Sequence, residues 1–206
     1  MHKQPAAVAR TLVLASTSRY RRHLFERLRV PFETAAPGVD EEPYKHRGLS
    51  PNDMVRQLAE LKSRAVAPHW PSAIIVGGDQ CATIDGRLLG KPGTVERTIE
   101  QLSSLAGRTH QLVTALCVLD GVTGHCDTMV DVHEMTMRPL DAEQIRRYVE
   151  LDEPVDCAGS YKLESLGVAL FERVSGSDPT AIVGVPLMQL VTMLARCGYD
   201  VFRAAR

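Results

Sequence analysis

Two polar segments, far apart in the chain, carry the residue types that phosphate-ester hydrolysis requires. In the first, an apolar run ends at Ser16, and the arginines Arg21 and Arg22 follow. In the second, an apolar run ends before Asp79, and Lys91 comes after it in a Gly-Lys-Pro sequence. Hydroxyls, free backbone N–H groups and arginines bind anions, and a carboxylate can take a proton from water. Together the segments predict an anion cradle with an acid and a lysine beside it.

The first segment is predicted to be a strand over 11–15 that leads into a helix over 18–28. Such a helix leaves free N–H groups at its first turn, where they attract anions. Arg21 and Arg22 fall close to this end, where the helix dipole disfavours a cation by about 0.3–1 kcal/mol, and a bound anion would reverse that penalty. A surface helix with an ordinary serine cap and solvated arginines explains the same residues, so this segment alone leaves both interpretations open.

In the second segment, Asp79 follows a predicted apolar strand over 73–76. Ligands of open α/β sheets bind beyond the carboxyl ends of the strands, where a carboxylate can hold a divalent metal or accept a proton. The alternative is a turn aspartate at the start of a predicted hairpin over 80–89. Lys91 does not belong to a P-loop, because the glycine spacing is wrong and proline follows it. It is a candidate phosphate ligand or a solvated turn lysine.

Three further charged residues are candidates. Glu41 lies in an acidic run within a predicted loop over 38–50 and could ligate a metal, although such loops are usually solvated. Lys62 lies on the inner side of a predicted helix over 51–67, from which it could reach a phosphate or extend to solvent. Glu164 lies in an irregular stretch, where a binding loop is reasonable.

The bulk composition excludes several classes of protein. The chain has 206 residues, a formal net charge of −1, 44% hydrophobic residues and 24% charged residues. This is typical of a globular protein and gives no basic field for a nucleic-acid polymer. No apolar stretch approaches the roughly 20 residues that cross a bilayer, and the N-terminus has no signal-peptide core. The five scattered cysteines include no CxxC pair, which favours a reducing cytoplasm.

Strand and helix signals alternate along the chain, which predicts an α/β fold in one domain over 1–206. Residues 1–10 are predicted to be a flexible N-terminal extension. The other predicted elements are an extended segment over 30–35, a helix over 95–105, strands over 111–119 and 124–137, a helix over 141–151, an irregular stretch over 159–171 that ends in a strand, and an apolar helix over 181–197.

Five motifs in order resemble the Maf family of nucleoside triphosphate pyrophosphatases, over nearly the whole chain. The motifs are Ala15-Ser16-Thr17-Ser18 with Arg21-Arg22, Val39-Asp40-Glu41, Leu58-Ala59 with Lys62, Gly78-Asp79-Gln80, and Leu89-Gly90-Lys91-Pro92. Each motif is weak alone, but the ordered set is specific. The resemblance implies a two-lobed fold, similar to the inosine triphosphatase fold, with a mixed twisted sheet, flanking helices and a central cleft. It also implies a divalent cation, Mg²⁺ or Mn²⁺, and a homodimer.

Within the family, the chain looks closest to the 7-methyl-GTP pyrophosphatase branch. Gln80 follows the aspartate where the dTTP/UTP branch typically has threonine, and the segments 157–164 and 170–173 also fit. The resemblance implies that Asp79 accepts the proton and that Tyr20, Gln80 and Glu164 set base specificity. The base chemistry agrees, because N7-methylated guanine is a cation that an aromatic face and a carboxylate hold well.

One position departs from the family pattern. The family usually has proline where this chain has Arg19, and proline suits the first turn of a helix because its missing N–H is not needed there. Arginine adds a charge and a backbone donor at this point. The catalytic set is unchanged, but the geometry of entry into the helix and the phosphate affinity are open.

We interpret the sequence as a cytoplasmic pyrophosphatase that cleaves the α–β phosphoanhydride of 7-methyl-GTP. The expected catalytic residues are Asp79, which activates water, and Lys62 and Lys91, which also hold the triphosphate. The other expected roles are phosphate binding by Ser16, Arg21 and Arg22, base recognition by Tyr20, Gln80 and Glu164, and metal binding by Glu41 and Asp79. One alternative is a preference for dTTP, UTP or another noncanonical nucleotide. The other is a nucleotide-binding regulator of cell division, against which the intact catalytic set argues.

Overall fold

A seven-stranded mixed β-sheet organises the computed structural model of the chain, which describes residues 10–206. The strand order is β2-β1-β3-β5-β6-β7, and β4 also pairs with β3. The strands are β1 (Leu12–Leu14), β2 (Glu33–Thr34), β3 (Ile74–Ile84), β4 (Arg87–Leu89), β5 (Thr109–Asp120), β6 (Cys126–Met137) and β7 (Phe171–Ser175). The first two strands run parallel to their neighbours and the others antiparallel, so the predicted mixed α/β fold is confirmed.

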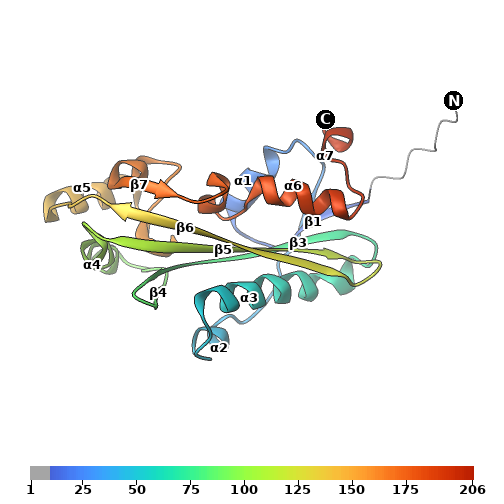
Figure 1. The fold of residues 1–206 in the computed structure, drawn as a ribbon, viewed down its shortest axis with the longest axis horizontal. Coiled ribbons are helices and arrows are strands. Elements are labelled where there is room, and N and C mark those ends of the chain that lie inside the picture. The colour runs from blue at the N-terminus through green and yellow to red at the C-terminus, as the bar shows by residue number, and fades with distance from the viewer. Residues whose placement is uncertain (1–9) are drawn as a thin grey trace, which may run out of the picture.

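Helices cover both faces of this sheet. The α-helices are α1 (Arg19–Glu26), α2 (Glu42–Lys45), α3 (Pro51–Val66), α4 (Val95–Leu105), α5 (Ala142–Asp152), α6 (Leu187–Arg196) and α7 (Val201–Ala204). The 3₁₀ helices are η1 (Ala67–His69), η2 (Ala158–Ser160), η3 (Leu166–Leu170) and η4 (Pro179–Val183). In Figure 1, β5 and β6 run along the length of the molecule, with α3 against one face of the sheet and α6 against the other.

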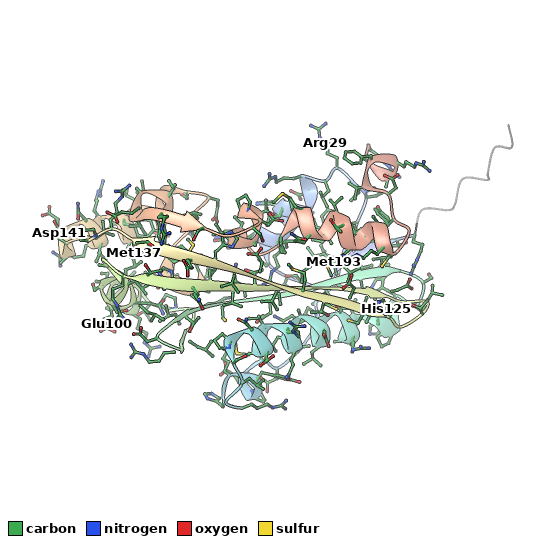
Figure 2. The ribbon with its side chains drawn as sticks, in the orientation of Figure 1. Arg29, Glu100, His125, Met137, Asp141 and Met193 are labelled. Atoms are coloured by element: carbon green, nitrogen blue, oxygen red, sulfur yellow. The ribbon has the colours of Figure 1, made fainter. Side chains whose placement is uncertain are left out.

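The hydrophobic core divides the molecule into two lobes. One lobe has a cluster on each face of the sheet, under α1 and α6 on one side and under α3 on the other. The second lobe has its own cluster, built from α4, α5 and the distal ends of β5 and β6. Met193 of the first lobe and Met137 of the second lie far apart along the long axis in Figure 2, and both are buried. The predicted two-lobed arrangement therefore has a physical basis in separate cores.

Close packing of α3 on β3 depends on Gly77. A Cβ atom at this position would overlap the carbonyl oxygen of Ala59 and the side chain of Ser63. Glycine therefore lets the helix approach the strand more closely than any other residue would. Because α3 packs closely on β3, Lys62 of the helix lies beside Asp79 of the strand.

Replacing Gly77 with alanine is expected to lower the free energy of unfolding by about 1–3 kcal/mol, because overpacking forces α3 away from β3. Urea denaturation measures the change. Gly90→Ala is the matched control, since a Cβ atom there has no heavy atom within 4 Å. Equal unfolding midpoints for the two variants would show that α3 can retreat without loss of stability.

Part of β3 has an open edge. On one side β1 pairs with 74–76 and β4 with 82–84, and within residues 10–206 no strand pairs with 77–81 on that side. On the other side, β5 pairs with β3 along its length. The sheet therefore has an opening between β1 and β4, and Asp79 and Gln80 lie at this opening.

The prediction that the strand ends before Asp79 is wrong. β3 continues to Ile84, and Asp79 pairs with Ala115 of β5 in the middle of the strand. Gly77, one of the two glycines before Asp79, lies within the strand and is required for the close packing of α3 on β3. The predicted hairpin over 80–89 is confirmed, because β3 turns at Asp85-Gly86 and pairs antiparallel with β4, which begins immediately after.

Two other predicted elements differ from the structure. The expected loop over 38–50 contains the short helix α2, which has a proline in its first turn. The expected helix over 181–197 is broken into η4 and α6, because Gly184 adopts a φ of +116° and Pro186 lacks an N–H to donate. The other predicted helices and the strands over 111–119 and 124–137 match the structure to within a few residues.

Arg10 ties the start of β1 to the far end of β5. Residues 1–9, most of the predicted N-terminal extension, lie outside the described residues. Arg10 itself donates from Nη1 and Nη2 to the two carboxylate oxygens of Asp120, at 2.8 Å each, and from Nη2 to the carbonyl of Ala73 at 3.1 Å. The Arg10 guanidinium holds the pKa of Asp120 well below its usual range.

Asp120→Asn is expected to lower the free energy of unfolding by about 1–3 kcal/mol at pH 7, since it removes a charge-assisted pair. The folded-state pKa of Asp120 is depressed, so the stabilisation is complete above the pKa of the unfolded chain and is lost as pH falls towards the folded pKa. In urea titrations from pH 7 towards pH 3, the difference in the free energy of unfolding between wild type and variant should become smaller. Asp127→Asn, which alters the more exposed pair with Arg196, is the control. A difference in the free energy of unfolding that stays constant with pH would contradict a stabilising role for the Arg10–Asp120 pair.

Within residues 10–206, none of the helices combines the length and apolar character needed to cross a bilayer.

Candidate active site

The turn between β1 and α1 forms one wall of the site. Ser18 is the N-cap of α1, where its Oγ accepts from the backbone N–H of Arg21 at 3.4 Å. The Oγ of the buried Ser16 accepts from the backbone N–H of Ser18 at 3.1 Å. The first turn of α1 contains no acidic residue, so the positive end of the helix dipole is uncompensated. This wall can bind an anion.

The two arginines of the first segment have different positions. Arg21 points into the site, where its Nε donates to the carbonyl of Gly184 at 3.2 Å. Burial lowers its pKa, and the charges of Asp79 and Glu41 oppose that shift. Arg22 is exposed and pairs with Glu26 at 3.2 Å, outside the residues that line the cavities of the site. The structure therefore brings Arg21, but not Arg22, to the site.

Gly184 makes room for Arg21, and Gly78 lies on the other side of the arginine. A Cβ atom on Gly184 would lie 3.3 Å from Nε of Arg21, which is a tight contact, and one on Gly78 would lie 3.9 Å from the same atom, which is an ordinary contact. Gly78 is on β3 and Gly184 follows η4, so the arginine is held between two segments that are distant in sequence. Its position depends on the break between η4 and α6 that the sequence analysis did not predict.

Lys62 joins two carboxylates at the centre of the site. Its Nζ lies 2.6 Å from Oδ1 of Asp79 and 2.6 Å from Oε1 of Glu41. The side chains of Lys62 and Asp79 are 7% and 8% exposed, whereas that of Glu41 is 40% exposed. Lys62 therefore points inward from α3 and does not extend to solvent, and the acidic loop contributes one carboxylate to the site.

The two carboxylates have opposite pKa shifts. Burial raises the pKa of Asp79, although the charges of Lys62 and Arg21 counteract it. Burial also acts on Glu41, but there the hydrogen bond and charge of Lys62 outweigh it and lower the pKa. Asp79 consequently has greater proton affinity than Glu41. Of the two, Asp79 is the better proton acceptor.

Two adjoining cavities meet at these residues. We call them the Asp79 cavity, of about 480 Å³, and the Glu164 cavity, of about 130 Å³. The Asp79 cavity is lined by Ser16, Glu41, Lys62 and Asp79 among others, and the Glu164 cavity by Tyr161, Leu163, Glu164 and Ile182 among others. Residues that line both are Ser18, Tyr20, Arg21, Gln80, Lys91 and Asp156. A ligand that spans both cavities would pass Lys91, which is exposed at the mouth.

The three predicted specificity residues all line the Glu164 cavity. Tyr20 is half-buried on α1 and Glu164 is exposed on the loop before η3. Gln80 lies on β3 next to Asp79 but projects to the other face of the sheet, because side chains alternate along a strand. Its Nε2 donates to Oγ1 of Thr114 at 2.9 Å and to the carbonyls of Ala181 and Ile182 at 2.9 and 3.0 Å.

Arg19 forms a contact that the family proline could not make. Its Nη2 donates to the hydroxyl of Tyr20 at 2.8 Å, and its guanidinium carbon lies 4.8 Å from the centre of the Tyr20 ring. It also lies 3.7 Å from Oδ2 of Asp156 on the opposite wall. The departure from the family pattern therefore places a cation on the aromatic face that borders both cavities.

Sequence reasoning missed three residues of the site. Gly184 had a usable signal, because a glycine two residues before a proline marks a helix break. Asp156 lines both cavities, but nothing in its sequence neighbourhood distinguishes it from a surface acid. Thr114 is a β-branched residue in a strand, and its contact with Gln80 arises only from the pairing of β5 with β3.

The residues of the Asp79 cavity are compatible with a divalent cation. Glu41 and Asp79 supply oxygen ligands, the type that Mg²⁺ and Mn²⁺ prefer, and both reach the same lysine nitrogen. Among residues 10–206, no cluster of three or more histidine, cysteine, aspartate or glutamate side chains could enclose an ion. A cation here would therefore need additional ligands from a bound anion and from water.

These features define a two-lobed α/β protein with a cleft that is lined by charged residues of both signs and built around a buried lysine–aspartate pair. The family model described as Maf-like protein matches residues 11–197. A 7-methyl-GTP pyrophosphatase of Pseudomonas aeruginosa is 44% identical over 191 residues, which cover 92% of this chain and 98% of that protein. Proteins of the same name from Cupriavidus pinatubonensis and Bdellovibrio bacteriovorus are 46% and 45% identical, over 94% and 89% of this chain and 96% and 95% of their own lengths. The chain belongs to the Maf family, which confirms the resemblance stated from its motifs.

Proposed function

We propose that this protein is a hydrolase that cleaves the α–β phosphoanhydride of 7-methyl-GTP and releases 7-methyl-GMP and pyrophosphate. The observation that carries the proposal is the buried Lys62–Asp79 pair, 2.6 Å apart, between an anion-binding wall and a cavity lined by Tyr20 and Glu164. The names of relatives that are 44–46% identical over most of the chain support the same activity.

Asp79 is the proton acceptor in this proposal. Burial raises its pKa, so its carboxylate accepts a proton more readily than an exposed aspartate does. Lys62 holds Oδ1 at 2.6 Å, which fixes the orientation of the carboxylate. A water molecule beside Asp79 would give up its proton as its oxygen attacks the α-phosphorus, and pyrophosphate would leave.

The anion-binding wall positions the triphosphate. Ser16 and the N-terminus of α1 offer neutral donors, and Arg21, Lys62 and Lys91 offer positive charge. Because phosphoryl transfer relies mainly on positioning and charge stabilisation, fixed cations account for much of the expected rate enhancement. Arg22 is not part of this proposal, because it points away from the cavities and pairs with Glu26.

A divalent cation, Mg²⁺ or Mn²⁺, would be held by Glu41 and Asp79 together with phosphate oxygens of the substrate. When bound, it would neutralise charge on the phosphates.

The Glu164 cavity would take the base. N7-methylated guanine is cationic, so the ring of Tyr20 and the carboxylate of Glu164 favour it over a neutral pyrimidine. Arg19 occupies a face of Tyr20 at 4.8 Å, and a stacked cationic base would share or replace that contact.

Pyrophosphate release from a panel of nucleotides tests the proposal. The panel comprises 7-methyl-GTP, GTP, dTTP, UTP, CTP and ITP, each with Mg²⁺, Mn²⁺ or Co²⁺ and with a chelator control. A strong preference for 7-methyl-GTP is expected. Preference for dTTP or UTP would leave the fold and the role of Asp79 intact but overturn the base assignment. Binding of nucleotides without release of pyrophosphate, with any metal, would favour a regulatory binder.

Glu164→Ala is expected to reduce kcat/KM for 7-methyl-GTP by about 10–100-fold, because a charged partner of the cationic base is lost. Its effect on UTP should be small. Glu150→Ala, on the exposed side of α5, is the matched control. An unchanged substrate profile in Glu164→Ala would instead support the dTTP or UTP alternative.

A cytoplasmic location, a homodimer and the absence of a nucleic-acid partner remain part of the proposal. The five cysteines are free, and free thiols are compatible with a reducing compartment. The formal net charge of −1 offers no general attraction for a nucleic-acid polymer.

A further inference from the structure

The side-chain amide of Gln80 is held in one orientation. Its nitrogen lies within 3.0 Å of three oxygens, which belong to Thr114, Ala181 and Ile182. Two of these are backbone carbonyls, which can only accept hydrogen bonds. The opposite orientation would place the amide oxygen of Gln80 against both carbonyls, which is unfavourable.

Thr114 completes this arrangement. Its hydroxyl donates to the carbonyl of Ala181 at 3.0 Å, so its lone pair is available to accept from Gln80. Thr114 is 1% exposed and pairs across the sheet with the buried Asp131 of β6. Ser177, which precedes η4, donates to Asp131 at 2.5 Å and ties that segment to the sheet. The acceptors that surround the amide nitrogen are therefore fixed by β5 and by η4.

With its nitrogen used in this way, Gln80 has one polar atom left for a ligand. Gln80 lines both cavities, and its Oε1 is the atom not occupied by Thr114 or η4. In the same cavity, Glu164 also offers only acceptor oxygens when ionised. Two acceptors in one cavity match a base edge that carries two adjacent N–H donors.

We propose that Thr114 is a positioning residue that acts together with the carbonyls of Ala181 and Ile182 to make Gln80 a hydrogen-bond acceptor only, so that the Glu164 cavity selects bases with a ring N–H next to an exocyclic amine. Guanine and 7-methylguanine carry this pair of donors. Hypoxanthine retains the ring N–H but lacks the amine, and adenine has a ring acceptor in place of the N–H. The inference rests on the proposed function for its nucleotide, and it adds which edge of the base is recognised and what fixes that choice.

The test compares 7-methyl-GTP with 7-methyl-ITP, which differ only in the exocyclic amine. The wild-type enzyme should favour 7-methyl-GTP in kcat/KM by about tenfold or more, because the analogue leaves an acceptor unpaired. Thr114→Val, which removes the hydroxyl and keeps the shape, should narrow this ratio at least threefold, mainly through KM. Thr114→Ser keeps the hydroxyl that Thr114→Val removes, so it should retain the wild-type preference for 7-methyl-GTP over 7-methyl-ITP.

A second readout separates this inference from the proposed activity. Calorimetric binding of 7-methyl-GMP and 7-methyl-IMP should show the same preference and the same loss in Thr114→Val, whether or not the protein hydrolyses triphosphates. If Thr114→Val fails to fold in thermal melting, Gln80→Met takes its place and should remove the preference. Equal affinity of wild type for the two monophosphates, binding of neither, or an unchanged ratio in the folded variants would overturn the inference. Absence of pyrophosphate release from every triphosphate would overturn only the proposed function.

Discussion

Asp79→Asn is expected to lower kcat for pyrophosphate release by about 10²–10⁴, the usual contribution of a general base. Asparagine has nearly the same shape as aspartate, and its carbonyl oxygen can still accept from Lys62, which lies 2.6 Å from Oδ1 in the wild type. Its amide cannot take a proton from water. Nucleotide affinity should therefore change only severalfold, because Arg21 and Lys91 remain in the site.

Two measurements separate catalysis from binding. Pyrophosphate release gives the turnover, and calorimetric titration with a triphosphate whose α–β bridge is a methylene gives the affinity. Asp85→Asn is the matched control, because it makes the same substitution in the turn after β3. Asp85 lines neither the Asp79 cavity nor the Glu164 cavity. A folded Asp79→Asn protein with near wild-type turnover would remove Asp79 from the role of proton acceptor.

Lys62→Met is expected to reduce kcat/KM by about 10²–10³, comparable to the loss of one fixed charge-stabilising donor. Methionine preserves the apolar stem of lysine but leaves Glu41 and Asp79 without the cation that joins them. Both carboxylates then face the triphosphate unneutralised, and the orientation of Asp79 is no longer fixed. Binding should weaken along with turnover, which distinguishes this variant from Asp79→Asn.

Lys45→Met controls for the loss of one positive charge near the same loop, because Lys45 pairs with Glu42 at the surface. Steady-state pyrophosphate release and calorimetric titration are measured for both variants, and thermal melting checks their folding. Removal of a lysine from a buried pair also destabilises the fold, so activity is compared well below the melting temperature. Activity of Lys62→Met within severalfold of wild type would show that the buried pair is structural.

The amino-acid sequence alone determined which residues could do chemistry and most of the elements that carry them. The helix α4 has the predicted bounds, because caps, glycines and apolar periodicity act locally. The ordered motifs also sufficed to place the chain in its family. These features depend on residues that are close together in sequence.

The tertiary structure decided how these residues meet. Asp79 lies within a long strand at an opening in the sheet, and it meets Lys62 because Gly77 lets α3 pack closely on β3. Gln80 faces the opposite side of the sheet, where Thr114 fixes its amide. Arg22, which looked equivalent to Arg21 in the sequence, points to solvent. Local signals could not give these outcomes, because strand pairing, helix–strand distance and the direction of a side chain depend on contacts between distant segments.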